Sequence, residues 1–484
     1  LNSSIVSLAS NNVFTNVSGT SITVSNGQHS SITNNVLTNT GTAGGNYSVI
    51  INGVDSLGNN RLHLSGNTFN GGNNGLSFLN MNALSIAGTG SPEVLVPDND
   101  GKKTFTNTVL NFDNVNHTTL ANMDLSRSSG IGGVGIIVSN SVSFVVNNNT
   151  IQSRSTGIIS NTSSVLTISE NEVSNCNNGG INISGGQNCT VTNNVLTNNA
   201  TLSGTSFSIS VNNVTSDGVK RLEVSGNTFT GGGNGLRFQN MADLKISNGS
   251  LAGSEVILLP GQGLGSLITE VLNVEICNNA MIQNVDLGYL VTTGRSGTGL
   301  RISTSSNVQV SGLSVSKRND GMIIFNSPSS NIEQSLFQNN GNGVRFQAGT
   351  GNLGSVVSNS NFSCNVVAFK NETNQTYAVA NNYWGADNGS STDGGSGEVY
   401  QNTNGGTLTG TTNFLTTPNA NIALTRPYIT NLTIGDVACP GTNTGQIVVN
   451  ANCDYCVNGV SNLQYQLNAG AFQTSNTFTG LGAG

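Results

Sequence analysis

Short stretches in which apolar and polar residues alternate recur along most of the chain, and polar bends separate them. Examples are residues 21–24, 180–183 and 343–346, where Ile, Val or Phe occupies every second position. A period of two is the pattern of a strand with one buried face. Apolar residues at helical spacing are almost absent, so the pattern predicts an all-β chain.

An Asn followed by a Val-Phe, Val-Leu, Thr-Phe, Thr-Ile or Glu-Val pair recurs at a spacing of about 22 or 23 residues, or about 32 or 33 where a unit carries an insertion. The recurring residues are Asn12, Asn35, Asn67, Asn149, Asn171, Asn194 and Asn227. A unit of this length closes one coil of three short strands and three bends, and the coils stack at about 4.8 Å. One coil cannot bury its inward residues, but a stack can. We therefore expect a right-handed parallel β-helix solenoid over residues 1–400.

These Asn residues have a structural interpretation that needs no function. Asn tolerates the left-handed conformation of a tight bend, and identical side chains on successive coils can hydrogen-bond along the axis as a ladder. The sequence favours these turn and ladder roles. Contact of some of these Asn residues with a ligand stays open as the alternative.

A second, longer repeat joins the units into one body. Residues 61–69 return as 221–229, and residues 34–39 return as 193–198. We expect a duplicated block of about 160 residues. Its copies are 12–170 and 171–334, with a partial third copy at 335–385. A residue needed for a repeated activity should recur in both copies.

The composition excludes several classes of protein. The 484 residues are 8% charged and 5% aromatic, with 62 Gly and only 7 Pro, which fits neither an ordinary globular enzyme nor a disordered tail. The net charge of −7 is weak and the 16 Lys and Arg are scattered, so we expect no nucleic-acid partner and no membrane insertion. Low charge also reduces repulsion between neighbouring rods, which makes self-association into a homo-oligomeric appendage plausible.

Two acidic clusters are weak candidates for calcium. Asp98 and Asp100 lie in an Asp-Asn-Asp-Gly stretch, but the second copy has Pro-Gly-Gln-Gly at 260–263, and the downstream acidic ligand of a full calcium loop is missing. Asp387, Asp393 and Glu398 lie in a stretch rich in Gly and Ser, which is typical of a plain loop. We expect solvated turns and no cofactor, with calcium as the alternative.

No catalytic constellation recurs. Carboxylates on neighbouring coils should lie about 22 residues apart, yet the acidic pair Glu170 and Glu172 has Gln334 and Leu336 as its counterparts. Arg61 and Arg221 recur at strand starts, where a lone Arg is more often a surface or ion-pair residue. Arg154 and Arg318 also recur, each just before a turn. We expect no catalytic residue in this chain.

The recurrent Asn steps, the Gly-Ile/Val-x-Ile/Phe strands and the Asn-Asn-Tyr-Trp-Gly run at 381–385 resemble the right-handed β-helix repeat proteins related to pectate lyases. The resemblance covers about residues 1–400. It implies the fold, but not the activity, because this fold serves lyases, hydrolases, adhesins and inert spacers alike.

The register changes after a linker or cap at 401–426, and alternating strands at 429–434, 446–449 and 463–467 predict a small immunoglobulin-like β-sandwich over 427–484, incomplete at its C-terminal end. The runs at 439–449, 463–468 and 472–484 resemble the repeat of the gliding-motility adhesin SprB. They are also similar to repeats in other very large surface proteins of Bacteroidetes exported by type IX secretion.

Cys453 and Cys456 favour a local disulfide over a zinc site. A zinc site needs four ligands, and this segment offers at most three cysteines and no nearby His.

Together these patterns predict a non-catalytic structural or adhesive segment of a very large secreted bacterial protein. We expect it to be extracellular, at the cell surface, as a rigid rod or the shaft of an adhesin or appendage. Glycans or proteins of the cell surface, of prey or of a host are the expected partners. An extracellular polysaccharide lyase or hydrolase of the β-helix type, and a glycan-binding module without chemistry, are the alternatives.

Overall fold

The structure is a computed structural model of all 484 residues. It describes residues 6–27, 29–54, 62–90, 92–97, 100–202, 206–215, 220–290, 294–349, 351–420, 422, 428–435, 445–452, 465, 467 and 473–481. The chain divides into two compact units, Leu1–Pro418 and Asn419–Gly484. Each unit is considered by itself.

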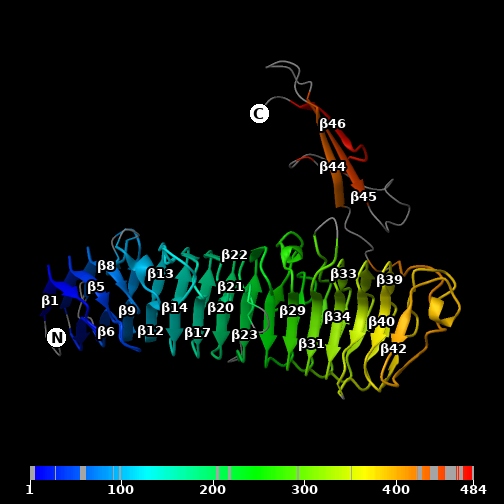
Figure 1. The fold of residues 1–484 in the computed structure, drawn as a ribbon, viewed down its shortest axis with the longest axis horizontal. Coiled ribbons are helices and arrows are strands. Elements are labelled where there is room, and N and C mark those ends of the chain that lie inside the picture. The colour runs from blue at the N-terminus through cyan, green and yellow to red at the C-terminus, as the bar shows by residue number, and fades with distance from the viewer. Residues whose placement is uncertain are drawn as a thin grey trace. The chain divides into compact units, whose positions relative to one another are not determined.

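The first unit is a stack of coils whose strands form long parallel sheets (Figure 1). One sheet has 15 strands, and each pairs in parallel with the strand of the coil before and the coil after. Its strands are β3 (Ile22–Ser25), β6 (Val49–Asn52), β9 (Leu76–Asn82), β12 (Thr108–Asn116), β14 (Val134–Ser139), β17 (Thr156–Asn161), β20 (Gly179–Ser184), β23 (Ile209–Asn212), β26 (Leu236–Gln239), β29 (Glu270–Glu275), β31 (Thr298–Ser303), β34 (Asp320–Phe325), β37 (Asn342–Phe346), β40 (Val367–Asn371) and β42 (Tyr400–Asn402).

The second long sheet has 18 strands and is also parallel throughout. In order of pairing they are β1 (Val6–Ser10), β4 (His29–Thr33), β7 (Leu62–Ser65), β11 (Val94–Leu95), β10 (Ser85–Ala87), β13 (Thr119–Ala121), β15 (Val145–Asn147), β18 (Thr167–Ser169), β21 (Cys189–Thr192), β24 (Leu222–Ser225), β28 (Val256–Ile257), β27 (Lys245–Ser247), β30 (Met281–Gln283), β32 (Gln309–Ser311), β35 (Asn331–Glu333), β38 (Val356–Ser358), β41 (Thr376–Ala378) and β43 (Thr407–Thr409).

Three shorter parallel sheets complete the coils. They contain β2 (Val13–Thr15), β5 (Val36–Thr40) and β8 (Thr68–Gly72); β16 (Thr150–Gln152), β19 (Glu172–Ser174), β22 (Val195–Thr197) and β25 (Thr228–Thr230); and β33 (Ser314–Ser316), β36 (Leu336–Gln338) and β39 (Asn361–Ser363). This arrangement confirms the predicted parallel β-helix. The solenoid runs a little beyond residue 400, because β42 and β43 still pair with the preceding coil.

The long repeat is visible in the way two insertions enter the stack. In the first copy β11 lies between β7 and β10, and in the second β28 lies between β24 and β27. Each insertion then continues into a single turn of 3-10 helix, η1 (Lys102–Thr104) or η2 (Leu264–Ser266). Both turns begin after a Gly with positive φ, Gly101 and Gly263. The two copies therefore share their irregular parts as well as their regular coils.

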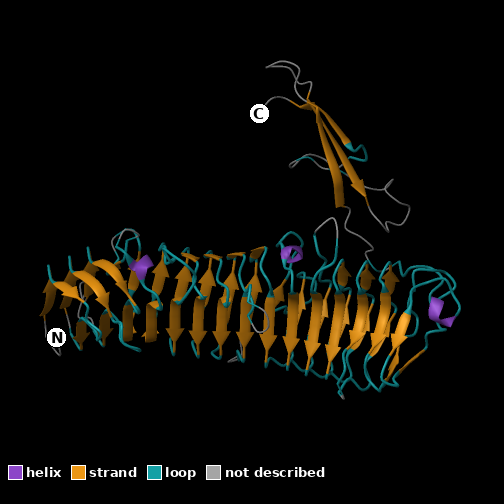
Figure 2. Cartoon of the chain, viewed as in Figure 1, coloured by secondary structure: helices purple, strands orange, loops and turns teal. Residues whose placement is uncertain are grey.

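Within the described ranges, helical structure is confined to short turns (Figure 2). Besides η1 and η2 there is η3 (Ser391–Asp393), near the C-terminal end of the first unit. In the part of the chain that the structure describes, no helix is long and apolar enough to cross a membrane.

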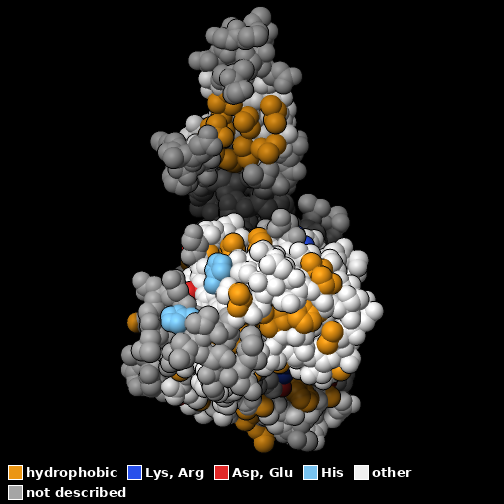
Figure 3. Space-filling model, turned by 90° about the vertical axis from the view of Figure 1, so that its left-hand side faces the viewer, with side chains coloured by type: hydrophobic (Ala, Val, Ile, Leu, Met, Phe, Trp, Pro, Cys, Tyr) orange, Lys and Arg blue, Asp and Glu red, His pale blue; other side chains and the backbone are white. Residues whose placement is uncertain are grey.

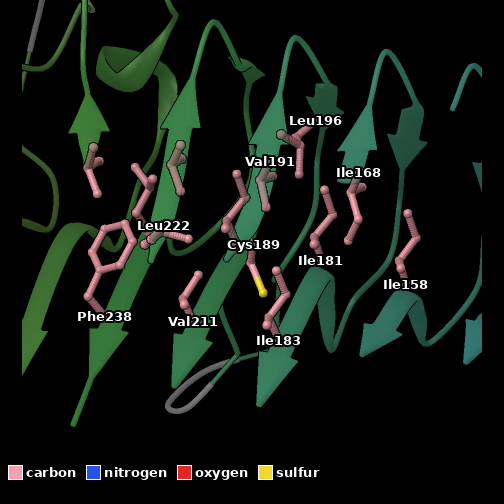
Figure 4. Packing of buried hydrophobic residues seen from close by; sticks show 14 of the residues in the cluster. Ile158, Ile168, Ile181, Ile183, Cys189, Val191, Leu196, Val211, Leu222 and Phe238 are labelled. Atoms are coloured by element: carbon pink, nitrogen blue, oxygen red, sulfur yellow. The ribbon is translucent and has the colours of Figure 1, made fainter. Parts of the chain in front are cut away.

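The core is a continuous apolar column inside the coils. Alternate residues of each strand point inward, so Ile158 and Ile181 lie in one row of this core, and Val211 and Phe238 lie in the neighbouring row (Figure 4). The register of the 15-stranded sheet aligns Ile181 with Ile158 on one side and with Ile209 on the other. Each coil thus buries its apolar residues against its neighbours, as the sequence predicted.

The second unit contains one antiparallel sheet among its described residues, formed by β44 (Tyr428–Gly435), β45 (Gly445–Asn452) and β46 (Thr477–Leu481). Its strands pair antiparallel, unlike those of the first unit. The two-sheet immunoglobulin-like sandwich stays a prediction, and Cys453 and Cys456, the predicted disulfide, lie outside the described residues.

Candidate functional site

Three of the recurrent Asn residues form a ladder at the N-terminal end of the solenoid. The side-chain amide of Asn12 donates to Asn35 Oδ1 at 2.9 Å, and that of Asn35 donates to Asn67 Oδ1 at 2.9 Å. The Asn35 and Asn67 amides also donate to carbonyls of the preceding coil, at Ala9 and Ile32. Asn35 and Asn67 are buried and Asn12 is exposed.

The other four form a second, fully buried ladder. Asn149 Nδ2 donates to Asn171, Asn171 to Asn194 and Asn194 to Asn227, each at 2.9 or 3.0 Å between the nitrogen and Oδ1. The Oδ1 of Asn227 also accepts the main-chain N–H of Asn194 at 3.0 Å. These side chains satisfy one another and the neighbouring main chain inside the wall of the solenoid.

The left-handed conformation does not belong to the ladder residues themselves. It falls on the residue just before each of them, which is Asn11, Asn34, Gly66, Asn148, Glu170, Asn193 or Gly226. This differs from our expectation, in which one Asn had both roles. A left-handed residue turns the chain, and the next Asn then points inward to the ladder.

The first calcium candidate is partly outside the described residues, because Asp98 is not among them. Asp100 is buried, accepts a hydrogen bond from the main-chain N–H of Lys102 at 2.9 Å and lies 3.5 Å from the Lys102 ammonium. The Lys102 ammonium also donates to the carbonyls of Val96 and Pro97. Among the described residues, no group of three or more His, Cys, Asp or Glu side chains is arranged to hold a metal ion.

The second acidic cluster is divided between separate contacts. Asp393 accepts a hydrogen bond from the Tyr400 hydroxyl at 2.7 Å. Glu398 accepts two from Asn365, one from its main-chain N–H and one from its side-chain amide. Burial raises the pKa of Glu398 to about 7, and the hydrogen bonds from Asn365 oppose that rise. Glu398 therefore ends a stack of polar side chains that begins at Asn340, whose amide donates to Asn365.

The recurrent Arg residues have two different roles. Arg221 pairs with Glu255 at 2.7 Å, as expected for an ion-pair residue, and its counterpart Arg61 lies outside the described residues. Arg154 and Arg318, in contrast, are completely buried and donate to main-chain carbonyls. Neither is available to a substrate.

The outer face of the 15-stranded sheet carries the densest group of charges in the described structure. It consists of the cations Arg237, Arg301, Arg345 and Lys370 and the carboxylates Glu270, Glu275, Asp320 and Glu372, on six successive coils. We call these eight residues the charged stripe. Its four positive and four negative charges add to zero. The end view of Figure 3 shows only a few charged side chains among the described residues.

The register of the sheet explains how the charged stripe is built. One row along the axis runs through Arg237, Asn273, Arg301, Ile323 and Arg345, each aligned with the next, and it continues to Lys370. The carboxylates flank this row on both sides. Because outward residues at one register position stack at about 4.8 Å, a cation on one coil reaches acids of the neighbouring coils.

Each carboxylate of the charged stripe accepts from a cation. Glu275 pairs with Arg237 at 2.5 Å and Glu270 with Arg301 at 2.8 Å. Arg345 lies between two acids, with Asp320 at 3.3 Å and Glu372 at 3.0 Å. These side chains are only 12 to 26% exposed, so water screens the pairs less than it screens pairs on an open surface.

The pKa shifts reflect burial and these partners. Burial raises the pKa of Glu270, and the charge and hydrogen bond of Arg301 oppose the rise. Burial also acts on Glu372, but hydrogen bonds from Lys370 and Arg345 outweigh it and lower the pKa of that carboxyl. A hydrolytic pair needs one carboxyl that is protonated and one that is ionised near the same bond. The guanidiniums favour the ionised form of each acid that they contact, and burial opposes this effect at Glu270.

A hollow of about 270 Å³ opens on this face near the start of the charged stripe. Phe207, Arg237, Asn273, Glu275, Arg301 and Phe325 are among its lining residues. The Arg237 guanidinium lies over the Phe207 ring, 5.7 Å from its centre. Asn273 is 8% exposed, and its Oδ1 accepts no hydrogen bond from the described part of the chain.

Sequence reasoning missed the charged stripe, although a signal for it was present. Gly-Leu-Arg-Phe at 235–238, Gly-Leu-Arg-Ile at 299–302 and Gly-Val-Arg-Phe at 343–346 repeat one strand pattern with Arg at the outward position. The stretch at 343–346 served only to predict a strand. An outward Arg at the same position of three strands in one sheet indicates a row of guanidiniums along the axis.

Comparison with known proteins agrees with the fold. Residues 107–249, which include β12 to β27, match the family model of the right-handed β-helix region. The match identifies the solenoid as a right-handed parallel β-helix. No curated protein sequence matches the chain.

Solved structures with a similar course of the chain are distant. The A-module of the mannuronan C-5 epimerase AlgE6 from Azotobacter vinelandii is 11% identical, with a TM-score of 0.37, over 81% of this chain and 90% of that one. The catalytic domain of a GH87 α-1,3-glucanase in complex with tetrasaccharides is 13% identical, with a TM-score of 0.28, over 81% of this chain and 63% of that one. The tailspike protein of the E. coli bacteriophage HK620 in complex with a pentasaccharide is 10% identical, with a TM-score of 0.28, over 94% of this chain and 80% of that one. At these TM-scores the likenesses carry no argument about activity.

Proposed function

We propose that this chain is a rigid, non-catalytic spacer in a large extracellular surface protein, where it holds a binding region away from the cell. The observation that carries this proposal is the unbroken parallel register of the 15-stranded sheet from β3 to β42. With neighbouring strands about 4.8 Å apart, that sheet extends about 67 Å along the axis. A body in which each coil contacts only its neighbours gains length with every added coil.

The state of the acidic residues supports a role without turnover. On the charged stripe every carboxylate contacts a cation, and the four acids are balanced by four bases. Such a network fixes the outer face of the sheet. Each carboxyl of the charged stripe is therefore held by at least one cation on the same face.

The C-terminal unit supports a place in a longer protein. Its resemblance to repeats of large type IX-secreted adhesins of Bacteroidetes is consistent with an array of immunoglobulin-like modules next to the solenoid. We propose a location at the cell surface on this basis. Self-association of rods into an appendage belongs to the same proposal.

The test combines location, shape and activity. Immunogold labelling of intact cells with an antibody against residues 100–400 should decorate the cell surface, and negative-stain electron microscopy of the purified chain should reveal a rod. Incubation with polygalacturonate and with neutral glucans should release neither unsaturated uronates nor reducing ends. Release of either product would contradict the non-catalytic role, and labelling only after permeabilisation would contradict the surface location.

A further inference from the structure

We propose that the hollow around Asn273 is a binding site for a neutral saccharide. It lies over β26, β29 and β31, and its lining includes Phe207, before β23 and under the Arg237 guanidinium, and Phe325, at the end of β34. Its volume of about 270 Å³ is just below the roughly 300–1,000 Å³ of sites for drug-sized ligands. That size suits one or two sugar rings.

The charge of the site selects an uncharged ligand. Arg237 is neutralised by Glu275 and Arg301 by Glu270, so the hollow presents both signs at close range and no net charge. An anionic ligand would have to compete with two carboxylates for the same guanidiniums. A cationic ligand would meet two guanidiniums beside those carboxylates. A neutral ligand is repelled neither by the carboxylates nor by the guanidiniums.

The hydrogen-bonding groups of the site select hydroxyls. Asn273 Oδ1 needs a donor, whereas the guanidinium N–H groups need acceptors. A carboxylate only accepts and an ammonium only donates, but a hydroxyl does both. A polyol with neighbouring hydroxyls can therefore satisfy Asn273 and one of the arginines with the same ring, while the half-buried face of Phe325 contacts the apolar C–H groups of that ring.

Access to the amide oxygen requires a side chain to move. Asn273 is aligned with Arg237 on one neighbouring strand and with Arg301 on the other. The side chains of these arginines are 17% and 25% exposed, and rotation of either one toward solvent opens a path to Asn273. A buried acceptor without a donor costs free energy, so a ligand hydroxyl that reaches it offsets part of the cost of moving the arginine.

The row that contains Asn273 also provides a matched control. Asn182 on β20 occupies the same register position two strands before Arg237, through Ser210. Its Oδ1 likewise accepts no hydrogen bond from the described residues, but Asn182 does not line the hollow. Asn273→Ala and Asn182→Ala therefore remove the same chemical group from the same face, and only the first removes it from the proposed site.

The experiment measures binding of the neutral hexaoses cellohexaose, mannohexaose and laminarihexaose, with hexagalacturonate as the acidic comparison, to the full chain. Saturation-transfer NMR identifies the bound sugar and titration calorimetry gives its dissociation constant. We expect at least one neutral hexaose to bind, and we expect Asn273→Ala and Phe325→Ala each to weaken it about tenfold, as loss of one hydrogen bond or one ring contact does. Asn182→Ala should bind like the parent chain.

Three results would overturn the proposal. These are no binding of any of the three neutral hexaoses, binding of hexagalacturonate alone, or equal weakening by Asn273→Ala and Asn182→Ala. Circular dichroism of each variant, recorded beforehand, separates loss of the site from loss of the fold. The site is independent of the spacer role, because cell-surface location and rod shape are measured without sugar.

Discussion

Arg154 and Arg318, which lie about 160 residues apart, donate to equivalent main-chain carbonyls in the two copies of the long repeat. Nε of Arg154 donates to the carbonyl of Leu125 at 2.9 Å, and Nε of Arg318 to that of Leu287 at 3.0 Å. Both guanidiniums also reach back to the chain that follows the 3-10 turn, Arg154 to Phe105. Each Arg therefore connects one insertion, through hydrogen bonds, to the coils that follow it.

Replacement of Arg154 by Met should loosen the first insertion. The carbonyls of Phe105, Leu125 and Ser126 would lose their donor inside the protein, at a cost of about 1–3 kcal/mol for each buried group left unsatisfied. We expect local opening of residues 100–107 to become easier by about 3 kcal/mol, measured by hydrogen exchange with mass spectrometry. Arg295→Met is the control, because Arg295 is exposed and donates a hydrogen bond to the Asn339 carbonyl. Equal protection of residues 100–107 from hydrogen exchange in the two variants would contradict a role of Arg154 in holding the first insertion in place.

Asn194→Ala should destabilise the centre of the solenoid by about 2–4 kcal/mol. The substitution removes the acceptor of the Asn171 amide and the donor to the Ile168 and Thr192 carbonyls, all in or near the buried wall. Asn161→Ala is the matched control, since Asn161 is exposed and donates one long hydrogen bond to Ser139. Its effect should stay within about 0.5 kcal/mol. Hydrogen exchange of β19 and β22 distinguishes the two variants, and similar losses of protection would contradict the ladder as a source of stability.

The C-terminal coils should be more stable in mild acid than in mild base. Burial raises the pKa of Glu398 to about 7, above the ordinary value of a free carboxyl, so the folded state holds the proton more tightly. This contribution is fully present below about pH 4.5 and is lost as the pH rises through 7, with a limit of about 3 kcal/mol. The emission of the buried Trp384 during urea unfolding at pH 5 and pH 8 reports it. Glu398→Gln should flatten the difference, and an unchanged difference in that variant would assign the effect to another group.

The charged stripe should contribute more to stability than an exposed ion pair does. In a double-mutant cycle between Arg345 and Glu372 we expect a coupling free energy of about 1 kcal/mol, because the two side chains are 26% and 16% exposed. The pair between Lys220 and Glu223, both 42% exposed, should couple by less than about 0.5 kcal/mol. Equal coupling of both pairs at the same ionic strength would count against a structural role for the stripe.

Three cysteines should resist alkylation in the folded protein. Burial raises the pKa of the Cys176 and Cys189 thiols to about 12 and that of Cys277 to about 11, which leaves almost no thiolate at pH 8. Cys364, in contrast, is exposed. Iodoacetamide at pH 8 followed by peptide mapping should modify Cys364 and spare the other three until denaturant is added. Rapid modification of Cys189 without denaturant would indicate that the column opens locally.

The sequence was sufficient to predict the fold because each coil repeats a local pattern. The inward-facing residues follow from three regular features: alternating apolar and polar positions in each strand, a bend after it, and an Asn at a fixed spacing. Asn171, Asn194 and Asn227 form a ladder for that reason. The position of the left-handed residue was assigned one place too late. That error arose because Asn is common both in the bend and in the ladder.

The repeated Arg at 237, 301 and 345 was a signal for the charged stripe, but its ion pairs could not be predicted at the same level, because they cross insertions of different length. Arg237 and Glu275 are 38 residues apart, whereas Arg345 and Glu372 are 27 apart, so no single spacing connects the pairs. The burial of Arg154 had no signal either, since its acceptors are main-chain carbonyls and any residue type can supply them. Features set by one residue type at a fixed period, such as the Asn ladder, were predictable from the sequence. Contacts that depend on the length of the insertions between strands, such as these ion pairs, were not.

The parallel stacking has a mechanical consequence. Hydrogen bonds between coils run along the axis of the solenoid, so a pulling force applied to its two ends loads them in tension, one coil at a time, and not in shear. Each coil that peels away releases about 22 residues, or about 75 Å of extended chain, in exchange for about 4.8 Å of folded length. A solenoid of this kind lengthens stepwise when it is pulled at its ends, and each step limits the force that is transmitted along it.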